Sequence, residues 1–368
     1  MTPPLLSLCM IVKDEADQIE ACLSSVHMVV DEIIVVDTGS TDGTQEICRK
    51  FGAKVVEAPW ENSFAKARNT GLQAAKGEWI LWLDADEVLQ EENQGELRQA
   101  VGASKDDAFF MKIIHYIGSQ KEQASRHTAY RCGQIRLFRN KKGFQFVRDI
   151  HEVLQWPAIA SRDLPIPLLP VHIHHFGYMD DAVKCKQKAL RNLKLLRQEK
   201  KQTRQDPWCD YHLANEFFRA KQWEDAFTLV NQAIKGFLST KQPPPSICYK
   251  LKFDILFQHG SMRGAWPGIA RAIQIYPNYV DLHFYKGVFL MEHGLYPEAI
   301  KAFERCLEIG DEQWEHFSEQ GLGSFHAFHY LGRCMERMGK AQESHVYDHY
   351  SASSMRSSSS SQKREVVL

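Results

Sequence analysis

Residues 5–89 alternate short apolar runs with amphipathic segments, and this alternation restricts the fold more than any other feature of the chain. The apolar runs predict strands at Leu5–Val12, Glu32–Asp37, Lys54–Glu57 and Trp79–Leu83. Helical spacing predicts helices over Ala16–Ser25, from the turn cluster TGSTDG to about Phe51, and over Ser63–Ala75, where Ser63 is a cap. Short strand–helix units of this kind predict a mostly parallel sheet with helices on both faces.

Two polar clusters follow the ends of the expected strands. Asp37-Thr38-Gly39-Ser40 follows the second strand, and Asp84-Ala85-Asp86 follows the apolar run WILWL. Open sheets of this class bind ligands at the carboxyl ends of their strands. Two carboxylates one residue apart suit a hard divalent cation that also holds diphosphate oxygens. Acidic turns are also common after strands without a metal, and Asp37 could simply cap the next helix.

Four segments in this region occur together: LSLCMIVKDE, EIIVVDTGSTDGT, FAKARNTGL and KGEWILWLDADEVL. Their order and spacing resemble those of the family-two glycosyltransferases, over about Leu5 to Leu89. The resemblance implies an α/β GT-A (Rossmann-like) domain that binds a nucleotide-sugar. It also implies an inverting transfer of the sugar, assisted by a divalent metal, Mn²⁺ or Mg²⁺.

The resemblance assigns individual residues as well. The implied donor-binding residues are Val12, Asp37, Arg68, Asn69, Asp84 and Ala85. Asp37 matches the acidic residue that contacts the nucleotide base, and it favours a base that offers an N–H, which makes a UDP-sugar the expected donor. Arg68 and Asn69 match the pair in the helix that faces the nucleotide. Asp84 and Asp86 match the carboxylates that contact ribose and metal.

Two positions depart from the family pattern. Thr38 stands where many relatives have a second Asp, so the base pocket lacks a second acid. The first strand ends in Val12-Lys13-Asp14-Glu15 rather than in the commoner Pro-Thr-Tyr-Asn, a variant that is similar to a subset of the family.

The segments RLFRNKKGFQFVRDIHEVL and VHIHHFGY resemble the second half of the same domain in enzymes with C-terminal helical repeats. These enzymes include transferases that glycosylate bacteriocin peptides on cysteine or serine. An inverting transfer needs a base near the acceptor, and we expect Glu152, or second Asp149, in this role. Glu152 could instead pair with Arg136 or Arg139.

The resemblance also implies a histidine metal ligand late in the domain. His175 fits this position, and an imidazole beside Asp84 and Asp86 suits Mn²⁺ better than Mg²⁺. The alternative is a core histidine, because His172 and His174 lie in the same expected strand.

The second half of the chain predicts an all-α region of tetratricopeptide-like repeats. Similar residues recur at a shift of thirty-four positions in three segments, with a weaker fourth copy or cap at 328–350. Before them, a basic amphipathic helix is expected over 180–204. We therefore expect a GT-A domain at 1–178, a basic linker helix at 179–205, repeats at 206–350 and a disordered Ser-rich tail at 351–368.

The composition of the chain limits the cellular compartment and the classes of binding partner that we expect. The net charge of −1 argues against binding to nucleic acid, which needs a basic field. The nine cysteines are scattered and form no CxxC pair, which predicts reduced thiols in a cytoplasmic protein. The start of the chain lacks the cationic stretch of a secretory signal, and no apolar run is long enough for a transmembrane segment.

Several functions remain open from the sequence. The acceptor could be a polypeptide, a saccharide or a lipid-linked glycan, and the repeats could bind it or form a homodimer. A nucleotidyltransferase would use a similar sheet, but Lys13-Asp14-Glu15 is a poor triphosphate-binding loop. In a repeat-based binding scaffold the first domain would be inert, which the paired carboxylates with Arg68 argue against.

Overall fold

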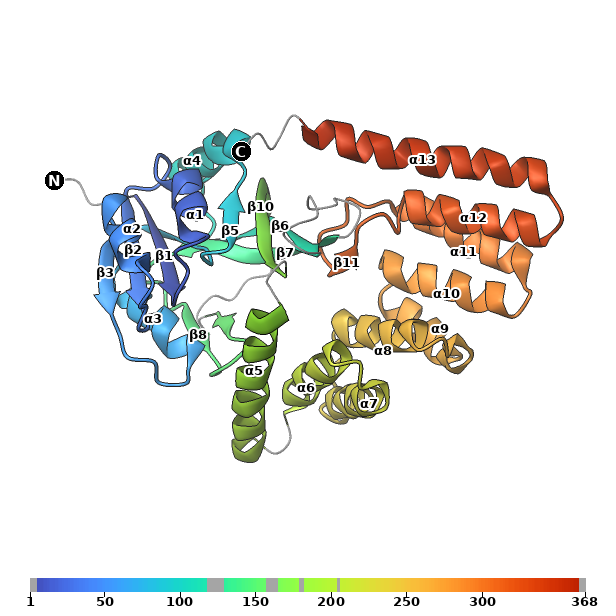
Figure 1. Ribbon diagram of the computed structural model, residues 1–368, viewed down its shortest axis with the longest axis horizontal. Helices are drawn as coiled ribbons and strands as arrows, with labels where there is room; N and C mark the ends of the chain where they lie inside the picture. Colours follow the sequence, from blue (N-terminus) through green and yellow to red (C-terminus); the bar gives the residue numbers. More distant parts are fainter. Residues whose placement is uncertain (1–4, 118–128, 157–164, 179–181, 204–205, 364–368) are drawn as a thin grey trace. The chain divides into compact units, whose positions relative to one another are not determined.

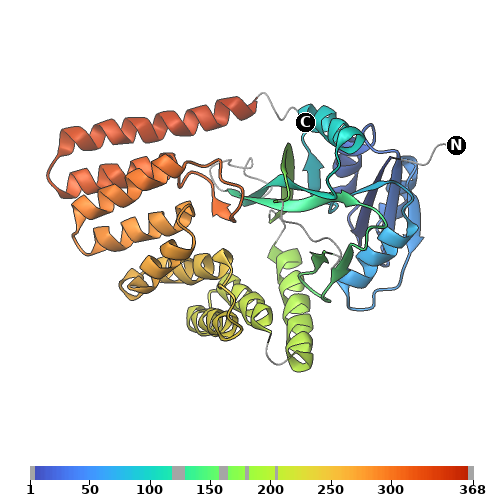
Figure 2. The same cartoon turned by 180° about the vertical axis from the view of Figure 1, so that it is seen from behind.

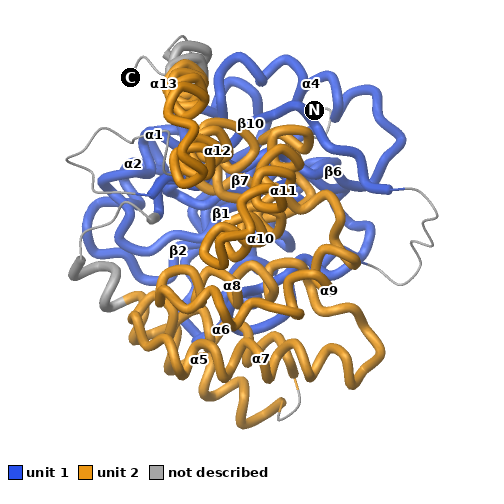
Figure 3. The backbone as a smooth tube through the Cα atoms, turned by 90° about the vertical axis from the view of Figure 1, so that its right-hand side faces the viewer, with its two compact units in different colours: residues 1–121, 133–181 blue, residues 122–132, 182–368 orange. Residues whose placement is uncertain are grey.

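The computed structural model describes residues 5–117, 129–156, 165–178, 182–203 and 206–363. The chain divides into two compact units, the first made of residues 1–121 and 133–181 and the second of residues 122–132 and 182–368 (Figure 3). No helix in the described segments is both long enough and apolar enough to cross a lipid bilayer.

The first unit is built on a sheet with the strand order β3-β2-β1-β4-β7-β6-β10-β5 (Figures 1 and 2). Its strands are β1 Leu6–Val12, β2 Glu32–Asp37, β3 Lys54–Glu57, β4 Trp79–Trp82, β5 Glu87–Leu89, β6 Ala108–Ile117, β7 Ala129–Arg139 and β10 Leu168–Tyr178. The strands β1 to β4 are all parallel, which confirms the predicted α/β sheet. The carboxyl ends of β1, β2 and β4 therefore lie along one edge.

The remaining strands make the sheet mixed. β7 runs antiparallel to β4, while β10 is parallel to β6 and antiparallel to β5. A separate two-stranded sheet consists of β8 Gln145–Val147 and β9 Val153–Gln155.

The helices of the first unit are α1 Ile19–Val26, α2 Thr44–Lys50, α3 Phe64–Ala74, the 3₁₀ turn η1 Glu91–Asn93, and α4 Gln94–Ala103. Helix α3 begins after the expected cap, because the Ser63 hydroxyl accepts a hydrogen bond from the Lys66 amide at 3.3 Å. β1 is buried along nearly its whole length, as expected for a parallel strand covered on both faces.

The second unit is a series of helices, which confirms the predicted all-α repeat region. Its helices are α5 Ala182–Gln202, α6 Pro207–Arg219, α7 Trp223–Ser239, α8 Ser246–Gln258, η2 Met262–Ala265, α9 Gly268–Ile275, α10 Val280–Glu292, α11 Tyr296–Ile309, α12 Phe325–Arg337 and α13 Ala341–Lys363. From α6 onward, successive helices form hairpins that stack side by side (Figure 1). Small residues set their spacing: a Cβ on Gly287 would lie 2.5 Å from the Phe303 ring.

A short strand belongs to this helical unit as well. β11, Ser318–Glu319, pairs with Tyr130 and Arg131, which are residues of the second unit although they begin strand β7. The Tyr130 ring stacks on Phe317, and Arg131 forms an ion pair with Glu312 at 2.9 Å.

The C-terminal tail differs from the expectation of disorder after Ser351. Helix α13 continues through this position to Lys363. The reason is packing against the preceding helix: α12 contacts α13, Ser351 is 7% exposed, and its hydroxyl donates to the Phe325 carbonyl at 2.9 Å. Contacts with a neighbouring helix thus override the low apolar content of the tail.

Candidate active site

The turn that carries Asp84 and Asp86 follows β4 directly, and Glu87 fixes its shape. The Asp84 amide donates to Glu87 Oε2 at 3.0 Å, and the Glu87 amide donates to the Asp84 carbonyl at 3.1 Å. Glu87 is fully buried, and Ala85 is buried beside it. The turn therefore leaves β4 in one defined conformation at the edge where β1 and β2 also end.

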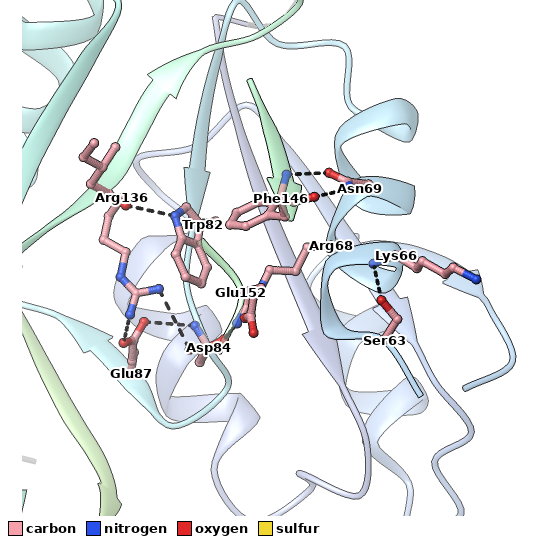
Figure 4. A network of polar contacts seen from close by, with 11 residues as sticks. Ser63, Lys66, Arg68, Asn69, Trp82, Asp84, Glu87, Arg136, Phe146 and Glu152 are labelled. Carbon is pink, nitrogen blue, oxygen red and sulfur yellow. Dashed lines mark hydrogen bonds and ion pairs between the residues drawn. The ribbon is translucent and has the colours of Figure 1, made fainter. Parts of the chain in front are cut away.

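Arg68, on α3, links this turn to a carboxylate far along the chain. Its Nη2 donates to Asp84 Oδ1 at 2.7 Å, and its Nε donates to Glu152 Oε1 at 2.5 Å (Figure 4). The guanidinium lies 4.0 Å from the centre of the Trp82 ring, so it is stacked as well as paired. The alternative in which Glu152 pairs with Arg136 or Arg139 names the wrong arginine, because the partner in the structure is Arg68.

The charges in this cluster shift one another's protonation. Burial raises the pKa of Asp84, but Arg68 and then Arg136 outweigh it and hold this pKa at about 2. Burial would lower the pKa of Arg68, yet Asp84 and Glu152 hold it above its usual value. Asp84 is therefore ionised at every physiological pH.

A second arginine stands on the other side of Trp82 in Figure 4. Arg136 Nη2 donates to Glu87 Oε1 at 2.5 Å, and its guanidinium lies 3.8 Å from the Trp82 ring centre. Burial raises the pKa of Glu87 even though Arg136 counteracts it. The sequence reasoning missed Glu87 and Trp82, although both flank the Asp84-Ala85-Asp86 cluster that it identified.

The expected metal ligands separate into two groups. His175 Nε2 lies 3.5 Å from Asp86 Oδ1, whereas Asp84 is directed at Arg68. Among the described residues, Asp84, Asp86 and His175 do not form a compact triad of ligand atoms. The structure therefore brings Asp86 and His175 together and places Asp84 beside them in an ion pair.

Two features of Asp86 suit a bound cation. Within the described part of the chain its buried Oδ1 has no hydrogen-bond partner. The neighbouring Gly177 also lets both ligand types approach its backbone closely, since a Cβ there would lie 2.3 Å from Asp86 Oδ2 and 2.7 Å from His175 Nε2. A carboxylate oxygen without a hydrogen-bond partner and an imidazole nitrogen close to it fit a divalent metal.

A second histidine contacts His175. His115 Nδ1 lies 2.7 Å from His175 Nδ1, and the two rings meet edge to face. Burial, then His175 and Arg136, lower the pKa of His115 well below its usual value. Burial would also lower the pKa of His175, but Asp86 raises it overall.

The other two histidines of this strand bond elsewhere. His174 Nδ1 lies 2.8 Å from the Tyr116 hydroxyl in the core. His172 Nδ1 lies 3.2 Å from Asn93 Oδ1. The core alternative therefore describes His174, while His175 points to Asp86.

Asp37 organises the loop after β2. Its carboxylate accepts from the Ser40 and Gly39 amides, the Ser40 hydroxyl and Gln45 Nε2. Burial raises the pKa of Asp37, but these hydrogen bonds lower it overall. Thr38, the departure from the family pattern, bonds through both its amide and its hydroxyl to the Val12 carbonyl, at 3.0 and 3.1 Å. The ends of β1 and β2 are thereby joined.

Two further predicted residues have structural contacts. The Asn69 side chain donates to the Phe146 carbonyl and accepts from its amide, both at 2.8 Å, which ties α3 to β8. The Asp149 carbonyl accepts from the Phe64 amide at 2.8 Å, while its side chain is exposed.

Comparison with known proteins finds a family to which the first unit is similar. Residues 7–162 match the family described as Glycosyl transferase family 2. A TPR repeat-containing protein of Synechococcus elongatus is 32% identical over 259 residues, which cover 68% of this chain and 60% of that protein. The SPbeta prophage-derived glycosyltransferase SunS of Bacillus subtilis is 26% identical over 64% of this chain and 54% of its own length.

A third relative matches a smaller share of the chain. An uncharacterized glycosyltransferase of Rickettsia typhi is 34% identical over 168 residues, which cover 43% of this chain and 54% of that protein. The chain thus spans between 54% and 60% of these three relatives.

We expect replacement of Arg68 by leucine to destabilise the protein by about 3 kcal/mol at neutral pH, because two partly buried carboxylates lose their shared cation. Wild-type Asp84 keeps its charge until the pH falls toward 2, so its contribution is intact between pH 7 and 4. In the variant, burial favours protonation, so the penalty should shrink as the pH falls to 4. Urea unfolding of both proteins measures this difference.

Arg98→Leu is the matched control, since it breaks an exposed pair with Asp31 and should cost below about 1 kcal/mol. A penalty for Arg68→Leu that is constant from pH 7 to 4 would contradict the assigned pairing.

Proposed function

From the membership of residues 7–162 in glycosyltransferase family 2, we propose that the protein transfers a sugar from a nucleotide-sugar to an acceptor with inversion. The observation that carries the proposal is the Arg68–Asp84 ion pair at the carboxyl edge of β4. The same edge holds the Asp37 loop, so a base and a diphosphate could lie along it together. The activity and the substrates of the whole protein are proposed on the same basis.

We propose UDP-sugar as the donor. Asp37 is buried and ionised, and its four loop donors already use the roughly four acceptor sites of a carboxylate, so an N–H of uracil would replace one of these donors, such as Gln45 Nε2. Val12 and Thr38 close the other side of this loop. Arg68, Asn69, Asp84 and Ala85 are the remaining proposed donor-binding residues.

We propose that Asp86 and His175, with Asp84 beside them, hold a divalent cation, Mn²⁺ in preference to Mg²⁺. The charge balance supports this assignment: the ion pairs within the described residues join four carboxylates, of Asp84, Asp86, Glu87 and Glu152, to two guanidiniums and the His175 imidazole. A bound dication would offset this excess and neutralise charge that develops on the leaving diphosphate.

Two residues remain candidates for the base that activates the acceptor. Glu152 Oε1 is held by Arg68, so Glu152 would accept the proton on Oε2. Asp149 is exposed three residues before it and carries no such pair among the described contacts. The ion pair with Arg68 gives Glu152 a fixed orientation beside Asp84, which favours it over Asp149.

For the acceptor we propose a polypeptide, modified on a cysteine or serine side chain. Support comes from the resemblance to peptide-modifying transferases and from helix α5. A hollow on α5 is lined by Leu190, Leu193, Lys194, Arg197, Gln198 and Lys201. Leu190 is 61% exposed, so this face combines apolar surface with cations and suits an acidic amphipathic segment.

We also propose a cytoplasmic location. Six cysteines of the described segments are buried free thiols: Cys9, Cys22, Cys48, Cys248, Cys306 and Cys334. This fits a reducing compartment, where thiols persist.

Asp86→Asn should lower sugar transfer by on the order of 100-fold or more, because one metal-binding oxygen becomes an amide. Excess chelator should abolish wild-type activity, and added Mn²⁺ should restore it. Nucleotide release from UDP-sugars measures both effects. Glu92→Gln, which removes one exposed charge from the same unit, is the control and should keep full activity. Full turnover in excess chelator would contradict a metal-dependent transfer.

Asp37→Asn should weaken UDP binding about tenfold, the equivalent of losing one hydrogen bond to a charged acceptor. Calorimetric titration with UDP and other nucleoside diphosphates measures the affinity and the base preference. Asp42→Asn is the matched control, because Asp42 also organises this loop through Thr44 and Ala16 but is not assigned to the base. Equal losses in the two variants, or none, would remove Asp37 from the donor site.

Reversing the charges of Lys194, Arg197 and Lys201 to glutamate should raise KM for an acidic peptide about tenfold at low salt, with hydrolysis of donor unchanged. The effect should diminish as salt screens the charges. The control carries the same reversals at Lys235, Lys241 and Lys301, exposed positions elsewhere in the unit.

The same variants separate the competing acceptors. If the charge reversals leave the transfer kinetics unaltered, and a saccharide or lipid-linked glycan is the better acceptor, then the face of α5 does not bind a peptide. Conversion from dimer to monomer, measured by light scattering, would make this surface a homodimer interface instead.

A further inference from the structure

His175 is a proposed metal ligand, but its partner His115 has no part in the function proposed so far. The two residues are direct partners on the parallel strands β6 and β10. Their Nδ1 atoms lie 2.7 Å apart, a hydrogen-bond distance. A hydrogen bond between two ring nitrogens needs one donor and one acceptor, so one of the two Nδ1 atoms carries a proton and the other does not.

The other nitrogen of His175 faces the acidic turn. His175 Nε2 lies 3.5 Å from Asp86 Oδ1, on the side of the ring away from His115. Gly177 lies against both side chains, and a Cβ at this position would clash with them. The backbone fixes Asp86 in turn, because the Phe176 amide donates to the Asp86 carbonyl at 2.9 Å.

We propose that His115 is a positioning residue: it accepts the Nδ1 proton of His175 and so presents the Nε2 lone pair of His175 to a divalent cation beside Asp86. This inference rests on the proposed metal-dependent function. A histidine that binds a metal through one ring nitrogen commonly donates the N–H of its other ring nitrogen to a neighbouring acceptor. This hydrogen bond fixes both the tautomer and the orientation of the ring. A buried imidazole, 5% exposed, is the acceptor in this chain.

The same two strands contain a natural control. One residue farther along β6, the Tyr116 hydroxyl lies 2.8 Å from Nδ1 of His174, the residue that precedes His175 on β10. Tyr116 and His174 are both buried, and their rings stack. This second pair lies on the same strands and is similarly buried, but His174 points to Tyr116 whereas His175 points to Asp86, so it separates stability from metal binding.

The test uses the full-length protein and measures Mn²⁺ affinity by electron paramagnetic resonance, with UDP present and without acceptor. His115→Leu, which lacks an acceptor, should weaken Mn²⁺ binding about 10- to 100-fold. His115→Asn places its amide oxygen close to the position of the lost Nδ1 and should restore the affinity to within a few-fold of wild type. Tyr116→Phe should lower the melting temperature without changing Mn²⁺ affinity.

The outcomes distinguish this inference from the function on which it rests. If wild type binds no Mn²⁺, or Asp86→Asn binds it unchanged, the proposed metal site itself is wrong. If wild type binds Mn²⁺ and Asp86→Asn does not, while His115→Leu binds as wild type does, only the role of His115 is wrong. Equal weakening in His115→Leu, His115→Asn and Tyr116→Phe would show a structural effect and would also overturn the positioning role.

Discussion

The ion pairs of Arg68 organise the candidate site. A guanidinium can satisfy two carboxylates in one plane, and Arg68 does so with Asp84 and Glu152 while it stacks on Trp82. Burying these acids without a cation would cost several kcal/mol each. Helix α3, which starts at the Ser63 cap, carries Arg68, so the position of α3 decides whether Asp84 in the turn after β4 stays ionised. The Ser63 cap and the charge of the site are therefore linked through the Arg68 side chain.

The sequence predicted the part of the site that local motifs encode. Strands β1 to β4, the Ser63 cap and the positions of Asp37, Asp84 and Asp86 at one sheet edge all follow from short patterns. The partner of Glu152 could not be predicted in this way. Arg68 lies 84 residues before Glu152, and no periodicity states which arginine the fold brings to it. The helix through Ser351 was missed for the same reason, since packing on α12 decides it.

The helical unit shows a similar division. The thirty-four-residue spacing predicted the hairpins because each repeat is one local unit. It did not predict that Tyr130 would pack within this unit. Its ring lies 5.0 Å from Lys250 Nζ, which forms a buried ion pair with Asp281 at 2.8 Å. The chain's own residues cover these buried charges, so Lys250 is not exposed to an acceptor. The exposed cations of α5 are the ones that fit the proposed acceptor face.

Strand register decides the chemistry of the histidines on β10. His174 and His175 are adjacent in sequence and point to opposite faces, so one contacts Tyr116 in the core and the other contacts Asp86. A shift of one residue between β6 and β10 would exchange these surroundings. The pairing of β5 with β10 fixes the same register from the other side, because His175 is the direct partner of Glu87. One set of backbone hydrogen bonds thus positions both Glu87, which binds Arg136, and His175, which faces Asp86. The charge balance of the site depends on that register.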